Sequence, residues 1–268
     1  MRLTVDHLTR YSYDHPVRGV VQSHRLTPSR FDGQSVLDWS VTVTDGIPGG
    51  SFRDGAGDWV QSWSVLGPIS QIDVTVRGTV DTEDRAGVLH GNRETIPPEA
   101  WMGFTNPTYP EPALRALAQS VEGPTGLDLA HALSEAVSDA ILYQAGVTNA
   151  QTTATEALAL GQGVCQDQSH ALIACARLRD MPARYVSGYL FATADGTLHE
   201  AAHAWAEIWV RGLGWVGFDA ANRCCPDDRY IRLACGMDSN DAAPIRGISR
   251  GPGTESMEIS VAVAAAQQ

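Results

Sequence analysis

The sequence lacks several features that would assign it to common classes of protein. Among its 268 residues, no apolar run approaches the roughly 20 residues that a membrane-spanning helix needs. No polar low-complexity segment is long enough to form a disordered linker, and there is no internal repeat. We therefore expect a globular protein, and its 43% of hydrophobic residues is enough for one large core or two smaller ones.

Basic residues are also scarce. The chain has 19 Lys and Arg against 31 Asp and Glu, which gives a net charge of −12 and a pI near 5.0. Such an acidic chain is poorly suited to the phosphates of nucleic acid or to an anionic membrane surface. We expect neither as a partner. The composition does not indicate an oligomeric state.

The first half of the chain contains no cysteine, and the second half contains no Cys-x-x-Cys pair. The five cysteines are Cys165, Cys175, Cys224, Cys225 and Cys235. The missing pair spacing argues against a structural zinc site. An odd number of cysteines is typical of reduced thiols, and residues 1–7 show strand-like alternation rather than a signal peptide. We therefore expect a cytoplasmic protein.

The first third of the chain contains a series of strand patterns. Residues 36–43 and 59–65 are rich in β-branched and aromatic residues, and residues 72–80 alternate almost strictly. Gly46, Pro48, Gly49 and Gly50 predict turns between these runs. We expect residues 1–100 to form a β-rich N-terminal region, an antiparallel sandwich or meander, without a catalytic cluster.

Helical patterns begin near residue 112, and we expect residues 101–268 to form a second part of the chain, its core. Pro112 suits the first turn of a helix that runs to about Val121, and helical spacing continues from Leu127 to Tyr143. Thr153 and Glu156 form a capping box that opens a short helix ending at Gly161. Strand patterns return at 184–190 and 203–210. The chain as a whole therefore predicts an α+β fold.

The stretch 161–170 combines a glycine-rich turn with a cysteine at the start of a predicted helix. Ala171, Leu172, Cys175 and Leu178 recur behind Cys165 at the spacing of a helix, which ends before Pro182. A thiol in a first helical turn lies beside unpaired N–H groups and the positive end of the helix dipole. Both favour the thiolate, which is the nucleophilic form. The alternative is a buried structural cysteine.

The predicted strand 203–210 carries a second set of candidate residues. His203, Trp205, Glu207 and Trp209 share one face, because side chains alternate along a strand. If residues 211–213 form a three-residue hairpin loop, Trp209 lies opposite Trp215 and Asp219 opposite Trp205. Asp219 and His203 are then diagonal neighbours within side-chain reach. Cys, His and Asp in these positions form a nucleophile, a base and an orienting carboxylate.

His199-Glu200-Ala201-Ala202-His203 also matches the zinc-protease pattern H-E-x-x-H. That chemistry needs both histidines on one helix and a third ligand downstream. A strand pattern follows at once, and Ala206 and Trp209 stand where the extended pattern needs Gly and His. We therefore expect no metal and no other cofactor, and we interpret His199 and Glu200 as solvated residues at the rim.

Four segments in sequence order resemble the transglutaminase-like superfamily. They are Gly163–Asp167, Pro182–Tyr189, His203–Glu207 and Trp215–Asp219. The match spans roughly residues 150 to 225 and is most similar to bacterial members, which carry a β-rich region before the core. Arg25–Pro28, Asp54–Trp59, Asp228–Arg232 and Pro244–Gly247 also resemble that subgroup. Asp180 replaces the glycine expected at the helix end, where aspartate tolerates a left-handed conformation.

The resemblance implies a papain-like core of helices packed on an antiparallel sheet, with Cys165 as nucleophile, His203 as base and Asp219 as orienting residue. Further candidates are Gln162, Asp167 and Asn222 as oxyanion or supporting groups, and Trp205 and Trp209 as walls of the substrate cleft. The implied activity is acyl transfer from a peptide or carboxamide, so the resemblance implies a peptide or protein substrate. Water as acceptor gives a peptidase or amidase, and an amine gives a protein-glutamine transglutaminase. We favour hydrolysis, because no amine site or calcium loop is specified; a peptide-binding module without turnover is the other alternative.

Overall fold

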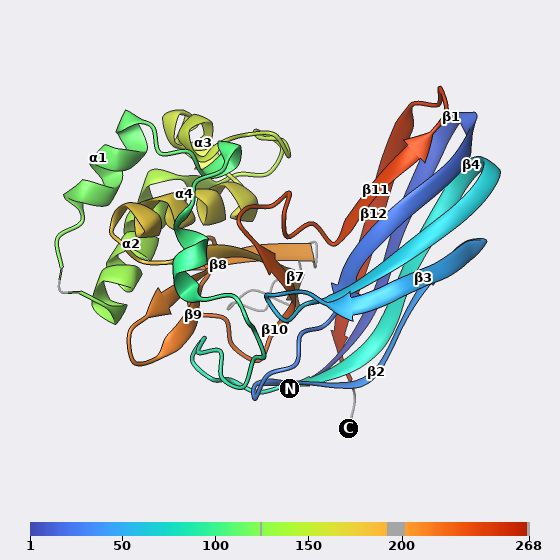
Figure 1. The fold of residues 1–268 in the computed structure, drawn as a ribbon. Coiled ribbons are helices and arrows are strands. Elements are labelled where there is room, and N and C mark those ends of the chain that lie inside the picture. Colours follow the sequence, from blue (N-terminus) through green and yellow to red (C-terminus); the bar gives the residue numbers. More distant parts are fainter. Residues whose placement is uncertain (124, 192–201, 267–268) are drawn as a thin grey trace.

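The computed structural model describes residues 1–123, 125–191 and 202–266, which form two parts lying side by side (Figure 1). One part is a six-stranded antiparallel sheet, and the other combines helices with a four-stranded sheet. The strands of the first sheet are β1 (Arg2–Thr27), β2 (Gln34–Val43), β3 (Gly46–Arg53), β4 (Trp59–Thr82), β11 (Ile245–Arg250) and β12 (Glu255–Ala265). This combination of antiparallel sheets and helices is the predicted α+β class.

The two longest strands, β1 and β4, each run through both halves of the N-terminal sheet. β1 pairs with β12 in its first half and with β11 in its second half, and its register with β4 shifts between Ser12 and Gly19. β4 pairs with β3 first and with β2 afterwards. One buried cluster joins Tyr11 and Ile72 from one half to Val20 and Val65 from the other. The two halves of this one antiparallel sheet therefore share a buried core.

Strand β3 occupies a segment whose glycines and proline predict turns, so that prediction is wrong. β3 pairs with β4, and its register is irregular between Pro48 and Ser51. Proline is tolerated in an edge strand because the outward N–H position makes no ladder hydrogen bond. The composition of the segment reflects its place at an edge and its bulge, not a break in the strand.

The second sheet has the strand order β10-β7-β8-β9, and all its pairs are antiparallel. Its strands are β7 (Ala183–Leu190), β8 (Ala202–Val210), β9 (Gly214–Phe218) and β10 (Tyr230–Gly236). Trp209 lies opposite Trp215, and Val210 pairs with Gly214, so residues 211–213 form a three-residue loop. The predicted hairpin register is confirmed.

The helices pack together beside this sheet (Figure 1). They are α1 (Pro112–Ser120), α2 (Leu127–Ala140), α3 (Ala154–Leu160) and α4 (Cys165–Leu178), with two short 3-10 helices, η1 (Pro98–Met102) and η2 (Asn106–Thr108), in the connector. Thr153 caps α3 with Glu156, and Gly161 ends it at a φ of 69°. Asp180 follows α4 with a φ of 58°, the left-handed conformation expected of it.

Two helical predictions need refinement. Helix α2 ends at Ala140, three residues before the predicted end at Tyr143, because residues 142–143 form strand β5 (Leu142–Tyr143). β5 pairs in parallel with β6 (Gln162–Gly163), the segment that leads into α4. Helix α4 itself is buried continuously from Asp167 to Arg177, because it lies between the sheet and the other helices. None of the helices in the described ranges has the length and apolar character needed to cross a bilayer.

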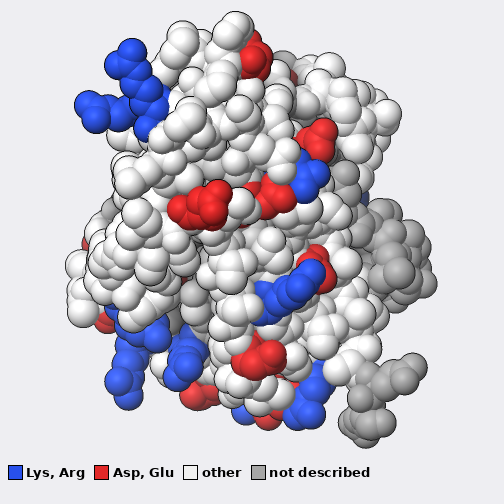
Figure 2. Space-filling view, turned by 90° about the vertical axis from the view of Figure 1, so that its right-hand side faces the viewer, with Lys and Arg blue, Asp and Glu red and all other residues white. Residues whose placement is uncertain are grey.

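The last two strands return to the N-terminal region. β11 and β12 both pair with β1, more than 200 residues earlier in the chain (Figure 1). We predicted residues 101–268 as the core, and these pairings place the end of that range in the other sheet. The boundary near residue 100 stays a prediction. On the face of the molecule opposite the helices, acidic and basic groups are interspersed among broad uncharged areas (Figure 2).

Candidate active site

The turn that precedes helix α4 is fixed by a buried carboxylate. Oδ2 of Asp167 accepts hydrogen bonds from the backbone N–H of Val164 at 2.8 Å and from the hydroxyl of Thr148 at 2.7 Å. Burial raises the pKa of Asp167, against the smaller lowering effect of these bonds. A Cβ on Gly163 would lie only 2.7 Å from the same oxygen. Asp167 therefore holds the turn that presents Cys165, which is half-buried at the start of α4.

The β8–β9 hairpin brings His203 and Asp219 together. His203 lies near the start of β8, and Asp219 directly follows β9. Nε2 of His203 lies 2.6 Å from Oδ2 of Asp219, and the two side chains are 9% and 1% exposed. This contact is the one that the three-residue loop predicts.

His203 also contacts Cys165, through a side-chain hydrogen bond and electrostatic attraction. Burial lowers the pKa of His203, but Asp219 and Cys165 raise it more strongly, to about 10. The imidazole therefore carries its proton at neutral pH and places a positive charge beside the thiol. Three elements that are separate in sequence, α4, β8 and the turn after β9, thus assemble one connected set of side chains.

Asp219 is held by two further donors. Oδ2 accepts hydrogen bonds from the Asn222 amide and the Tyr230 hydroxyl, both at 2.7 Å, and Oδ1 accepts one from the backbone N–H of Asn222 at 3.2 Å. Burial raises the pKa of Asp219, but His203, Asn222 and Tyr230 together lower it below its ordinary value. The carboxylate therefore stays charged although it is buried.

Tyr230 is the residue that sequence reasoning missed. It begins strand β10, the edge strand next to β7, and no motif spacing links it to Asp219. The segment Asp228–Arg232 attracts attention only through its resemblance to the family. Asn222, by contrast, lies three residues after Asp219, and the structure places it at the carboxylate as expected of a supporting residue.

The two tryptophans proposed as cleft walls lie in different places. The Trp205 ring stacks near the imidazole of His203, with centroids 6.4 Å apart, but it is only 3% exposed and so backs the histidine from the core. Trp209 packs edge-on against Trp215 with centroids 5.4 Å apart. It lies six residues along β8 from His203, or roughly 20 Å. The structure does not bring Trp209 to the site, because a shared strand face does not imply proximity.

The remaining predicted residues concern the oxyanion and the metal. Gln162 lies half-buried in β6, three residues before Cys165. His199 and Glu200 lie outside the described residues. His203 lies on a strand and is bonded to Asp219, which does not match the helix that H-E-x-x-H requires. Within the described ranges, no group of three metal-binding side chains is found.

His170, in the same helix as Cys165, does not serve as the base. It is fully buried, its Nε2 accepts a hydrogen bond from the backbone N–H of Ser239 at 3.1 Å, and its ring lies against Tyr185. Burial lowers the pKa of His170 to about 4. It is therefore a neutral packing residue.

Comparison with known proteins supports these observations. Residues 115–220 match the transglutaminase-like superfamily, and residues 3–81 match the bacterial transglutaminase-like N-terminal region. The chain is 26% identical over 280 residues to an uncharacterized protein of Mycobacterium leprae, covering 98% of each. It is 29% identical over 276 residues to one of Mycobacterium tuberculosis, covering 92% of this chain and 87% of the relative.

Among solved structures, the chain is similar to a proposed cysteine protease from Cytophaga hutchinsonii. The TM-score is 0.74 at 21% identity, and the superposition covers 100% of this chain and 92% of that chain. At this identity the similarity shows the fold alone, and the transglutaminase-like match rests on residues 115–220.

Proposed function

Residues 115–220 match the transglutaminase-like superfamily, and on this premise we propose that the protein is a cysteine-dependent acyl-transfer enzyme acting on peptide or carboxamide bonds, with water as the acceptor. The observation that carries the proposal is the connected set Cys165–His203–Asp219, in which a buried charged carboxylate holds a protonated imidazole beside a thiol. The similarity in fold to a protein described as a proposed cysteine protease supports the same class of activity.

The proposed reaction begins when the thiolate of Cys165 attacks the substrate carbonyl carbon. A carbon–sulfur bond forms, and the carbonyl electron pair moves onto oxygen. The backbone N–H of Cys165, at the free N-terminus of α4, and the side chain of Gln162 would donate hydrogen bonds to this oxyanion. His203 then gives its proton to the leaving amine as the carbon–nitrogen bond breaks, which leaves a thioester on Cys165.

Water completes the proposed cycle. His203, now neutral, accepts a proton from water as the oxygen attacks the thioester, and the acid leaves with regeneration of the thiolate–imidazolium pair. Asp219 keeps the imidazole oriented in both halves of the reaction. A primary amine in place of water would give an amide, which is the transglutaminase alternative.

A mass-spectrometric assay separates these activities. The protein would be incubated with a library of glutamine- and asparagine-containing peptides and a small primary amine. Backbone cleavage or conversion of carboxamide to acid is the expected result. Amine incorporation would identify a transglutaminase, and binding without any mass change would identify a peptide-binding module. The chain contains no lysine, so it offers no lysine amine of its own as a competing acceptor.

Matched cysteine variants identify the nucleophile in the same assay. Cys165→Ala should abolish every product, whereas Cys225→Ala, which removes another half-buried thiol that takes no part in the proposed reaction, should leave the products unchanged. The proposed location is the cytoplasm, on the ground of the odd number of cysteines. Fractionation of the source cells tests that proposal.

A further inference from the structure

The contacts of strand β10 point to a role for the N-terminal region in the active site. Tyr230 begins this strand and donates a hydrogen bond to Oδ2 of Asp219 at 2.7 Å. Its ring packs edge-on against Trp205, with centroids 5.5 Å apart, and Trp205 in turn stacks on His203. The position of Tyr230 therefore affects both the carboxylate and the surroundings of the imidazole.

The N-terminal region forms polar contacts with the chain on both sides of Tyr230. Two residues before it, the carbonyl of Asp228 accepts a hydrogen bond from the Thr82 hydroxyl, and the Asp228 carboxylate forms an ion pair with the N-terminal ammonium group at 3.4 Å. Two residues after it, the Gln34 side chain bonds both backbone groups of Arg232. It accepts from the N–H at 2.8 Å and donates to the carbonyl at 2.9 Å.

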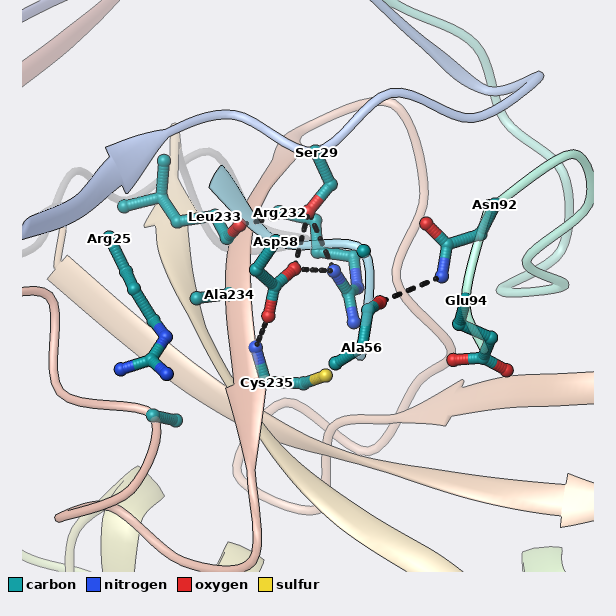
Figure 3. Close-up of polar contacts among 12 residues, drawn as sticks. Arg25, Ser29, Ala56, Asp58, Asn92, Glu94, Arg232, Leu233, Ala234 and Cys235 are labelled. Atoms are coloured by element: carbon teal, nitrogen blue, oxygen red, sulfur yellow. Dashed lines mark hydrogen bonds and ion pairs between the residues drawn. The ribbon is translucent and has the colours of Figure 1, made fainter. Parts of the chain in front are cut away.

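A buried ion pair between Asp58 and Arg232 adds to these contacts (Figure 3). Asp58, from the turn after β3, accepts a hydrogen bond from Nη1 of Arg232 at 3.1 Å and another from the backbone N–H of Cys235 at 2.7 Å. Ser29 accepts a hydrogen bond from the same Nη1 atom at 2.6 Å. The outer edge of β10, opposite its pairing with β7, is thus bonded to the N-terminal region along its length.

We propose that Tyr230 is a positioning residue for the Cys165–His203–Asp219 site and that the N-terminal region sets its position through Gln34 and Asp58. The inference deepens the proposed function and rests on it. The hydroxyl acts on the substrate only through Asp219. It stabilises the charged carboxylate, which in turn holds the imidazolium that faces Cys165.

Loss of the hydroxyl should alter the pH dependence of the site in a defined direction. Among the residues that the structure describes, the titratable groups that face Asp219 are His203 from β8, Tyr230 from β10 and Cys224 from its own turn, and Cys165 from α4 faces His203. The Asp227–Arg229 ion pair lies beside Cys224. Removing one donor from a buried carboxylate raises its pKa, so the carboxylate would become protonated at a higher pH.

The test measures the rate of Cys165 alkylation by iodoacetamide as a function of pH, which needs no substrate. Tyr230→Phe should move the acid limb of this profile upward by about one pH unit, so that alkylation is about tenfold slower at a pH on that limb and unchanged on the plateau above it. Tyr189→Phe is the matched control, because its buried hydroxyl bonds His7 at 2.7 Å and does not touch the site. Its profile should be that of the wild type. An unmoved acid limb in folded Tyr230→Phe would overturn the proposal.

A double-mutant cycle tests the contribution of the N-terminal region. Gln34→Ala should shift the same limb upward in the wild-type background and have no further effect in the Tyr230→Phe background. Full additivity of the two effects would show that Gln34 does not act through Tyr230. Gln34→Ala also serves if Tyr230→Phe fails to fold. If the alkylation profiles shift as expected but no substrate is turned over, only the proposed function is contradicted. The two failures are therefore distinguishable.

Discussion

The imidazole of His203 donates a hydrogen bond from Nε2 to Oδ2 of Asp219 at 2.6 Å, and both side chains are nearly inaccessible to solvent. In a buried pair of this kind, each charge is stabilised chiefly by the other. The third group, the thiol of Cys165, contacts His203. Reactivity and stability are therefore linked at this position.

Asp219→Asn should fold but lose most activity. The amide keeps the shape of the carboxylate but carries no charge to stabilise the imidazolium, and it can fix the wrong tautomer. We expect turnover to fall by about 10³- to 10⁴-fold. Asp139→Asn, at an exposed ion pair with Arg223, is the control and should retain wild-type turnover. A fully active, folded Asp219→Asn protein would show that the pair does not serve catalysis.

The His203 pair should give stability that depends on pH. The pKa of His203 is about 10 in the folded protein and 6.5 in its ordinary state. Its contribution to the free energy of unfolding is therefore complete below about pH 6.5 and is lost as the pH rises through about 10. We expect the difference in that free energy between wild type and His203→Gln to shrink over this interval in urea denaturation. A difference that grows with pH would contradict the raised pKa.

Cys165 should be the first cysteine to react with iodoacetamide at slightly acidic pH. It is half-exposed and lies beside the protonated imidazole. Burial raises the pKa of Cys175 to about 12 and, with a smaller effect of Cys224, that of Cys225 to about 11. Burial likewise raises the pKa of Cys224 and Cys235. Peptide mapping should find the label on Cys165, with activity falling in step; equal labelling of Cys224 or Cys225 would remove support for the nucleophile.

Glu207→Gln should destabilise the protein strongly. Nε of Arg184 lies 2.6 Å from one Glu207 oxygen, and Nε of Arg232 lies 2.7 Å from the other. Burial raises the pKa of Glu207, but the two arginines lower it more strongly, to about 2. Removing the charge leaves two buried guanidinium groups undercompensated, at a cost of about 3–5 kcal/mol in the free energy of unfolding. Asp81→Asn, at the exposed pair with Arg2, should change stability little.

Excess chelator should leave the activity unchanged. His203 lies on a strand and is engaged by Asp219 and Cys165, so the proposed reaction needs no metal. Rates would be compared before and after treatment and after addition of zinc. A loss of activity that zinc restores would revive the H-E-x-x-H interpretation of His199 to His203.

The sequence alone determined the features that depend on neighbouring residues. The helix that starts at Cys165 follows from the spacing of apolar residues, and the capping box at Thr153 follows from the choice of two side chains. The contact between His203 and Asp219 follows from one three-residue loop, because register in a hairpin is set by its turn. These signals are short-range, so they can be recognised without knowing the fold.

Only the tertiary structure decided which distant segments meet. Tyr230 reaches Asp219 because β10 pairs with β7, and β10 is bonded along its free edge to Gln34 and Asp58, about 200 residues earlier. The final strands join β1 for the same kind of reason. An edge strand can pair with any exposed partner of matching shape, and burial of apolar surface between whole sheets selects the partner. That selection is a property of the assembled layers and leaves no spacing in the sequence.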